Sequence, residues 1–134
     1  MDIVELKKIF KSKLRRESIV KGKLIIRQGF EKTTFEEFEK WFNITEFEEG
    51  CHYCKTTNER SLELYNKRFY ATRGGKRGKR LELDRKDPLK PYDELNNIVW
   101  CCYWCNNAKS NFFSEEEFKP IAESIGKVIM SIKF

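Results

Sequence analysis

The sequence contains Cys51-His-Tyr-Cys54 and, further along, Cys102-Tyr-Trp-Cys105, two cysteine pairs whose members are each separated by two residues. Each C-x2-C pair can hold a metal ion through both thiolates, and two pairs supply the four ligands of a tetrahedral zinc ion. The 47 residues between the pairs exceed the usual zinc-ribbon spacing, but the entropy of loop closure grows only logarithmically with length. We therefore predict a structural zinc site formed by Cys51, Cys54, Cys102 and Cys105.

Other uses of the cysteines fit less well. Disulfide bonds are typical of small secreted proteins, whereas Met1-Asp-Ile-Val-Glu-Leu-Lys-Lys8 lacks the apolar run and cleavage site of a signal peptide. A redox site needs only one of the two pairs. Cys101 could replace Cys102 as a ligand, although the C-x2-C spacing favours Cys102. We expect His52 to be structural or exposed to solvent rather than a zinc ligand, because the residues inside such a pair usually point away from the metal.

Length and composition indicate one folded domain. The chain has 134 residues, the size of one modest domain, and 40% of them are hydrophobic. Eleven Phe, five Tyr and three Trp argue against disorder. No apolar stretch approaches the roughly 20 residues of a membrane span. We expect a soluble, cytoplasmic protein with no membrane partner.

Positive charge is distributed unevenly along the chain. The net charge is +6 overall, made up of +6 over residues 1–30, −5 over 31–50, +7 over 51–90 and −2 over 91–134. Residues 73–80 combine three glycines with five cations, which are Arg73, Lys76, Arg77, Lys79 and Arg80. Because such closely spaced cations repel one another and glycines allow close backbone approach, this segment predicts contacts with a phosphate backbone. The charge of residues 1–30 fits a solvated surface equally well.

Hydrophobic spacing and capping motifs predict the helices. Apolar residues at helical spacing indicate an amphipathic helix over residues 2–16, while residues 19–30 fit either a strand or irregular structure. Thr34-Phe-Glu-Glu37 is a capping box that begins a short helix burying Phe35, Phe38, Trp41 and Phe42. Ser114-Glu-Glu-Glu117 is a second capping box, and the helix that follows carries Phe118, Ile121, Ile125, Val128, Ile129 and Ile132.

Two predicted strands and a helix surround the second cysteine pair. Leu81-Glu-Leu-Asp84 alternates as a strand does, Ile98-Val-Trp-Cys101 is a second β-prone run, and a helix is expected from Cys105 to Lys109. The fold class is therefore α+β. A zinc ion that fixes these strands to the helix would bring Asp84, at the end of the first strand, close to Asn106. Carboxylate and amide oxygens are suited to Mg²⁺ and leave coordination positions for phosphate and water.

The motifs together resemble a known nuclease family. Leu81-Glu-Leu-Asp-Arg85, Asn97-Ile-Val-Trp100 and Cys102-Tyr-Trp-Cys-Asn-Asn-Ala-Lys-Ser110 are similar to the ββα-metal motif of HNH nucleases, many of which carry such a zinc site. The motif itself covers about residues 50–112. The resemblance extends at both ends, from residues 33–41 through residues 111–118, and in this longer form it is most similar to small, rare-cutting HNH type II restriction endonucleases. It implies a single domain over 1–134, with a basic helical extension (1–48), a zinc-bound nuclease core (49–113) and a C-terminal helix (114–134).

The resemblance implies a role for each motif residue. Asp84 and Asn106 correspond to the ligands of the catalytic Mg²⁺, for which Mn²⁺ can substitute. Asn97 corresponds to the middle asparagine, which bridges the loop and orients the catalytic position. Lys109 follows Asn106 by one helical turn and could contact a phosphate of the DNA.

Arg85 stands where most of the family has the general-base histidine. An arginine stays protonated and cannot take a proton from water. The rare-cutting relatives also carry arginine here, so the resemblance implies that Arg85 clamps the scissile phosphate while another group activates water. Tyr53 is the first candidate, with packing over the zinc site as its alternative, and His52 is the second.

The function implied is a Mg²⁺-dependent DNA endonuclease. One active site cuts one strand, so sequence-specific cleavage of double-stranded DNA calls for a homodimer. The final helix could contribute to that interface or to the core. Three alternatives stay open: a phage- or homing-type nicking endonuclease, a non-catalytic zinc-stabilised DNA-binding module, and a redox or zinc-storage protein.

Overall fold

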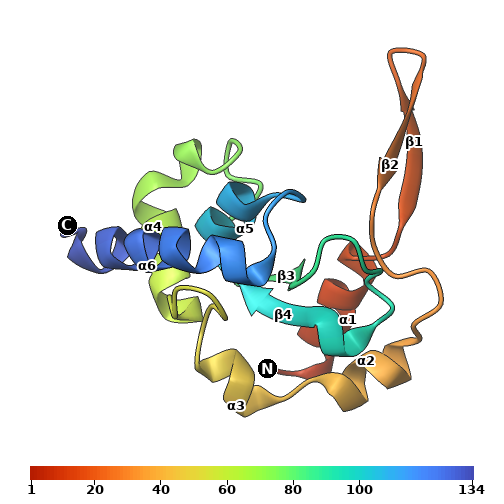
Figure 1. Cartoon of the computed structure of the whole chain (residues 1–134), viewed down its shortest axis with the longest axis horizontal. Coiled ribbons are helices and arrows are strands. Elements are labelled where there is room, and N and C mark those ends of the chain that lie inside the picture. Colours follow the sequence, from red (N-terminus) through yellow and green to blue (C-terminus); the bar gives the residue numbers. More distant parts are fainter.

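Two short antiparallel strands and the helix after them form the centre of the molecule. In the computed structural model, which describes residues 1–134, β3 (Glu82–Arg85) pairs with β4 (Ile98–Cys101) so that Leu83 lies opposite Trp100 and Asp84 opposite Val99. α5 (Tyr103–Lys109) begins directly after β4 and packs against β3. This ββα unit confirms the α+β fold class and the strand positions predicted from the sequence (Figure 1).

The other elements surround this unit (Figure 1). Before it in the chain come α1 (Ile3–Ser12), β1 (Arg16–Val20), β2 (Lys23–Arg27), α2 (Phe35–Trp41), α3 (Ile44–Glu48), α4 (Asn58–Arg68) and the 3₁₀ turn η1 (Phe69–Ala71). A second 3₁₀ turn, η2 (Leu95–Asn97), leads into β4, and α6 (Glu115–Ser131) ends the chain. No helix combines the length and the apolar character that crossing a membrane requires.

The predicted helix over residues 2–16 is wrong at its C-terminal end. α1 stops at Ser12, and residues 16–27 form the hairpin β1–β2 instead. Lys21 and Gly22 have positive φ angles of 51° and 75°, the backbone of the tight turn that matches the twist of paired strands. β-branched and apolar residues on both sides of this turn favour the strands over continuation of the helix.

Both predicted capping boxes are present. The side chain of Thr34 accepts from the backbone N–H of Glu37, and the side chain of Ser114 accepts from the backbone N–H of Glu117. In each box the glutamate side chain accepts in turn from the backbone N–H of the cap residue. α5 begins two residues earlier than predicted because Cys102 itself is its N-cap. α3 and α4 were not predicted; α4 has only Ser61 and Leu64 buried, so its sequence carries little helical periodicity.

An aromatic core connects the N-terminal segment to the ββα unit. Phe10, Phe30 and Phe38 lie within 5.4–5.6 Å of one another by ring centroids, and Trp41 continues the series to Trp100 on β4 at 6.0 Å. One contiguous cluster of 17 buried residues includes Leu6 of α1, Trp100 of β4 and Ala122 of α6. The N-terminal segment, the central unit and α6 therefore share one core.

α6 buries one side and leaves part of its apolar stripe exposed. Phe118, Ala122, Gly126 and Ile129 are buried, whereas Val128 is 60% exposed. A Cβ added at Gly126 would lie 3.0 Å from the carbonyl oxygen of Cys54. The helix thus packs directly against the first cysteine pair, and a side chain at position 126 would require the backbone of Cys54 to shift slightly.

Shortening a core aromatic should destabilise the whole fold. Phe38 is 0% exposed and contacts the rings of Phe10, Phe30 and Trp41, so Phe38→Ala is expected to lower the free energy of unfolding by about 3–5 kcal/mol. Phe112→Ala is the matched control, because Phe112 is 78% exposed and should change stability by less than about 0.5 kcal/mol. Equal losses in a denaturant titration of the two variants would contradict the core described here.

Candidate metal centres and basic cleft

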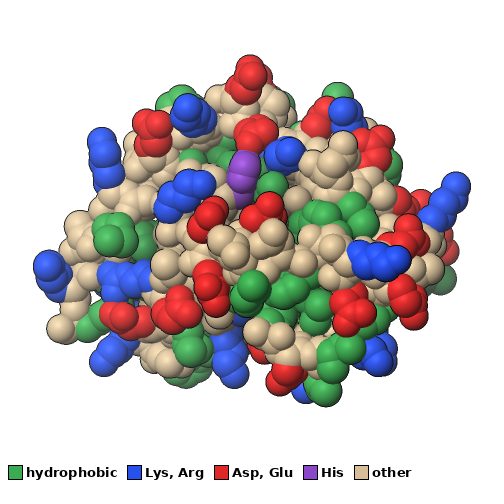
Figure 2. All heavy atoms as spheres, turned by 90° about the horizontal axis from the view of Figure 1, so that it is seen from below, with side chains coloured by type: hydrophobic (Ala, Val, Ile, Leu, Met, Phe, Trp, Pro, Cys, Tyr) green, Lys and Arg blue, Asp and Glu red, His purple; other side chains and the backbone are tan.

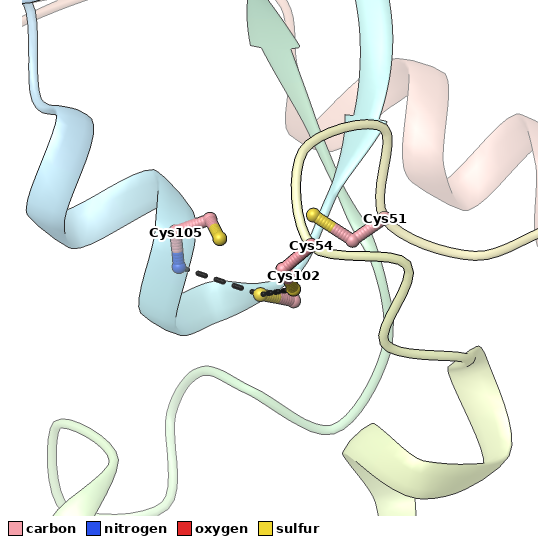
Figure 3. Close-up of side chains that lie close together, drawn as sticks. All are labelled: Cys51, Cys54, Cys102 and Cys105. Atoms are coloured by element: carbon pink, nitrogen blue, oxygen red, sulfur yellow. Dashed lines mark hydrogen bonds between the residues drawn. The ribbon is translucent and has the colours of Figure 1, made fainter. Parts of the chain in front are cut away.

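Four cysteine side chains converge on one point. Cys51 and Cys54 come from the loop before α4, and Cys102 and Cys105 come from the first turn of α5; Figure 3 shows their side chains directed toward a common centre. All four sulfur atoms lie within 4.8 Å of one another, with Cys54 Sγ 3.6 Å from Cys102 Sγ. A tetrahedral zinc ion with bonds of about 2.3 Å places its sulfurs about 3.8 Å apart. The geometry fits the predicted zinc site.

The remaining cysteine and the histidine lie outside this cluster. Cys101 is fully buried, its thiol donates to the carbonyl of Cys102 at 3.3 Å, and burial raises the pKa of that thiol well above its ordinary value. The choice of Cys102 over Cys101 as a ligand is confirmed. The ring Nε2 of His52 contacts a carboxylate oxygen of Glu115 on α6. His52 is therefore a structural residue at the surface, as expected.

A buried hydrogen-bonded group surrounds Asp84. The hydroxyl of Tyr53, inside the first cysteine pair, donates to Asp84 Oδ2 at 2.7 Å. The ammonium of Lys109 on α5 lies 3.2 Å from the same oxygen and donates to the carbonyl of Arg85 at 2.7 Å. Asp84 is 5% exposed and Lys109 is 0% exposed. Tyr53 and Lys109 thus hold one carboxylate oxygen from two sides.

Burial and charge act on the pKa values of this group. Burial raises the pKa of the Tyr53 hydroxyl, and the neighbouring Asp84 carboxylate raises it further. Burial also raises the pKa of Asp84, while the charge of Lys109 and the hydrogen bond from Tyr53 act in the opposite direction. Tyr53 is thus a neutral hydrogen-bond donor to Asp84 in this structure.

Asn106 faces a different carboxylate from the one predicted. Its side-chain nitrogen donates to Glu82 Oε1 at 3.0 Å, and Arg77 contacts the same oxygen at 2.6 Å. Glu82 and Asp84 lie two residues apart on β3 and share a face of the strand, while Asn106 and Lys109 lie one turn apart on α5. Asp84 therefore pairs with Lys109, and Asn106 pairs with Glu82. Shared metal binding by Asp84 and Asn106 stays a prediction.

Arg85 and Asn97 organise the loop between the two strands. The guanidinium of Arg85 donates to Asn111 Oδ1 at 3.1 Å and lies 4.7 Å from the ring centroid of Tyr92. The side chain of Asn97 accepts from the backbone N–H of Asp87 at 2.9 Å and donates to the carbonyl of Asp87 at 3.1 Å. These two bonds connect the two ends of the loop between β3 and β4, while the catalytic role implied for Asn97 stays a prediction.

A basic cleft adjoins β3 and α5 of the ββα unit. The cavity has a volume of about 870 Å³, and six cationic side chains line it: Lys13, Arg27, Arg73, Lys76, Arg77 and Arg80. Glu82 and Asn106 are also in its lining. Four of the five cations singled out in residues 73–80 thus meet two cations of residues 1–30 around this site. Lys79 does not line the cleft, and Lys109 is buried beside Asp84.

The cations of the 73–80 segment are not all free. Arg77 is bound to Glu82, to Asn107 at 3.2 Å, and over the ring of Tyr103. Arg80 donates to the carbonyl of Leu81. Arg73 and Lys76 are exposed. The face that includes the acidic helices α2 and α3 differs from the cleft, since acidic side chains are interspersed among the basic ones there (Figures 1 and 2).

Several residues that complete the site were missed from the sequence. Glu82 was detectable in principle, because strand alternation places it on the same face as Asp84. Asn111, Tyr92, Lys13 and Arg27 come from separate loops and strands, and the sequence shows no spacing that links them to Arg85 or to the cleft. Only the tertiary fold brings them together.

The ββα fold and the four-cysteine cluster are similar to those of an HNH endonuclease. A solved structure with a similar fold is that of the rare-cutting HNH restriction endonuclease PacI, with 28% sequence identity and a TM-score of 0.57. The similarity covers 72% of this chain and 64% of that one, so the match spans less than two thirds of PacI. No protein-family model and no curated protein matches the sequence. The predicted resemblance to this family is confirmed at the level of the fold.

Removing one cluster thiolate should abolish metal binding and folding together. We expect the wild-type chain to hold one zinc ion and Cys102→Ala to lose both the ion and the cooperative thermal transition, because structural zinc contributes folding free energy directly. Cys101→Ala is the control, since Cys101 is buried one residue away but lies outside the cluster. Zinc analysis and thermal melting check both. A Cys102→Ala protein with unchanged zinc content and melting temperature would contradict the site.

Proposed function

We propose that this protein is a Mg²⁺-dependent DNA endonuclease that hydrolyses phosphodiester bonds. The observation that carries the proposal is that Asn106 and Glu82 line the basic cleft, and that Glu82 shares a face of β3 with Asp84. Six cations lining one cavity provide the charge that a phosphate backbone requires, and Glu82 and Asn106 in the same lining carry oxygens that suit a hard cation. The structural likeness to an HNH restriction endonuclease supports the same reaction class.

In this proposal Asp84 and Asn106 hold the magnesium ion. The donor set fits the cation, because a carboxylate and an amide oxygen are hard ligands and the second carboxylate of Glu82 lies beside Asn106. The bound ion would neutralise the phosphate oxygens and stabilise the charge that develops on them. Lys109 is assigned to positioning Asp84 rather than to contacting DNA, because its ammonium is buried against that carboxylate.

Arg85 and Tyr53 complete the proposed catalytic group. Arg85 is assigned to the scissile phosphate, because the fork of N–H donors on a guanidinium matches two phosphate oxygens. Asn111 and Tyr92 already fix the direction of its guanidinium. Tyr53 is assigned to positioning the attacking water, because its hydroxyl lies 2.7 Å from the carboxylate of Asp84.

Cleavage of both strands at a specific sequence requires two such sites, and we propose a homodimer for this purpose. An apolar groove of about 560 Å³ lies between α4 and α6, and its lining includes Leu64, Trp104, Ile121, Ile125, Val128 and Ile132. Val128, one of these lining residues, is 60% exposed. This groove supports an interface, whereas a monomer with the same active site would nick one strand.

A second candidate function is a non-catalytic, zinc-stabilised DNA-binding module. It is favoured by the pairing of both carboxylates with cations, Glu82 with Arg77 and Asp84 with Lys109. In that case the acids serve only as counter-charges that hold the cleft in shape. A module of this kind binds DNA with the same salt dependence but leaves it intact.

A plasmid-nicking assay with purified, zinc-loaded protein separates these functions. Wild-type protein with Mg²⁺ should cut supercoiled DNA, and Asp84→Asn should cut at least about 1,000-fold more slowly, because a lost metal ligand removes several kcal/mol of transition-state stabilisation. Asparagine keeps the shape of Asp84 and still accepts from Tyr53 and Lys109. Asp2→Asn is the matched control, since Asp2 only caps α1 and asparagine caps equally well. No cleavage by wild type with Mg²⁺ or Mn²⁺ would contradict the proposal.

DNA affinity should depend steeply on salt. Replacing both Arg73 and Lys76 with alanine is expected to reduce the slope of log K against log salt by up to about 1.8, because each phosphate contact contributes roughly 0.9. Lys119→Ala plus Lys127→Ala on α6 removes the same charge away from the cleft and serves as the control. A fluorescence-anisotropy series from 50 to 300 mM salt, about the range over which such contacts weaken, measures the slopes. Equal slopes for the two double variants would place the DNA elsewhere.

A further inference from the structure

The β1–β2 hairpin extends away from the rest of the molecule (Figure 1). All ten residues of its two strands are exposed, and their register runs from Arg16–Arg27 at the base to Val20–Lys23 at the turn. An isolated two-stranded hairpin is at best marginally stable in water. Ile19, for example, is 76% exposed. A ribbon of this kind is typical of an element whose partner is another molecule.

The register divides the ribbon into two different faces. Residues paired across the strands share a face, so Ser18 and Ile25 lie with Val20 and Lys23 on one side. Arg16 and Arg27, which face each other where the ribbon joins the rest of the molecule, are on that side too. The opposite face carries Glu17, Ile19, Leu24 and Ile26. The first face therefore has positive charge at both ends, and the second has the ribbon's only acidic side chain.

The basic face of the ribbon is continuous with the basic cleft. Arg27 belongs to both, since it ends β2 and lines the cavity together with Lys13. The base of the ribbon is anchored there, because the backbone of Arg15 donates to Phe30 at 3.0 Å and that of Phe30 donates to Lys13 at 2.9 Å. A polyanion lying in the cleft thus passes along this side of the ribbon.

The dimensions of the ribbon match one feature of duplex DNA. Five residues per strand span about 17 Å at roughly 3.3 Å per residue, while the major groove is about 12 Å wide and about 8.5 Å deep and admits a two-stranded ribbon. Ser18 and Lys23 supply donors for base edges, and Val20 and Ile25 supply apolar contacts for thymine methyl groups. These residue types are the ones that read bases directly.

We propose that the β1–β2 ribbon enters the major groove of the duplex bound in the cleft and determines which base sequence the protein prefers. Ser18, Val20, Lys23 and Ile25 form the base-reading face, and Arg16 and Arg27 contact the flanking phosphates. This inference rests on the proposed function. It adds a specificity element that lies outside the ββα unit.

A shortened ribbon tests the inference. Replacing residues 17–26 with Asn-Gly joins Arg16 to Arg27 by a tight turn and keeps the anchored base. Wild type and this variant are each incubated with a library of random-sequence duplexes, and the bound and cleaved pools are sequenced. Wild type should enrich a defined sequence, whereas the variant should melt at the same temperature, bind total DNA within about tenfold of wild type and show no sequence enrichment.

Each other outcome is decisive. If the variant keeps the wild-type sequence preference, the ribbon does not read DNA and the inference fails, while the nuclease proposal stands. If it keeps the preference but changes from dimer to monomer by light scattering, the ribbon contacts a second copy of the chain and the inference is again overturned. If wild type itself neither binds nor cuts any duplex, the proposed function fails and this inference fails with it.

Point substitutions test which face is in contact with the bases. Ser18→Ala combined with Lys23→Ala should lower the preference for the enriched sequence by roughly 10-fold to 100-fold, the range expected for lost base contacts. Ile19→Thr combined with Leu24→Thr alters the opposite face and should change it less than about twofold. The reverse pattern would assign the apolar face to the DNA and overturn the assignment made here.

Discussion

Four cysteine sulfur atoms converge on one point and join the loop before α4 to the start of α5. Cys51 and Cys54 lie on a loop with little regular structure, and Cys102 and Cys105 belong to the first turn of α5. A metal ion between them would fix that loop against the end of β4, where the His52 backbone N–H also donates to the Trp100 carbonyl. Tyr53 lies between Cys51 and Cys54, and its hydroxyl donates to Asp84.

Opposite charges then maintain the polar side of the ββα unit. A buried carboxylate is costly unless it is paired, and Lys109 pairs with Asp84 while Arg77 pairs with Glu82. Lys109 belongs to α5, which begins at the second cysteine pair, and the 73–80 segment that carries Arg77 contacts Tyr103 of the same helix. The site is therefore preorganised with its acidic groups neutralised, and a divalent cation that binds there competes with these ammonium and guanidinium groups.

Local patterns in the sequence predicted local structure well. The cysteine spacing, the two capping boxes and the alternation of Leu81 and Leu83 each depend on neighbours within a few residues, and each matches the structure. Which side chains of one element lie opposite those of another was harder to predict. Whether Asn106 lies opposite Asp84 or Glu82 depends on how α5 is positioned along β3, which no spacing in the sequence specifies. The hairpin was obscured because Lys21 occupies a turn conformation that usually favours glycine or asparagine.

The proposed nuclease activity requires Asp84 and Asn106 to bind one divalent cation beside the basic cleft. Anomalous diffraction from crystals of the zinc-loaded protein soaked in Mn²⁺ locates such an ion. We expect a manganese peak with one oxygen of Asp84 and the amide oxygen of Asn106 each about 2.1–2.2 Å from the ion, close to the distances of Mg²⁺ sites. The proposal is contradicted if Asn106 stays bonded to Glu82 and Asp84 to Lys109 with no manganese between them.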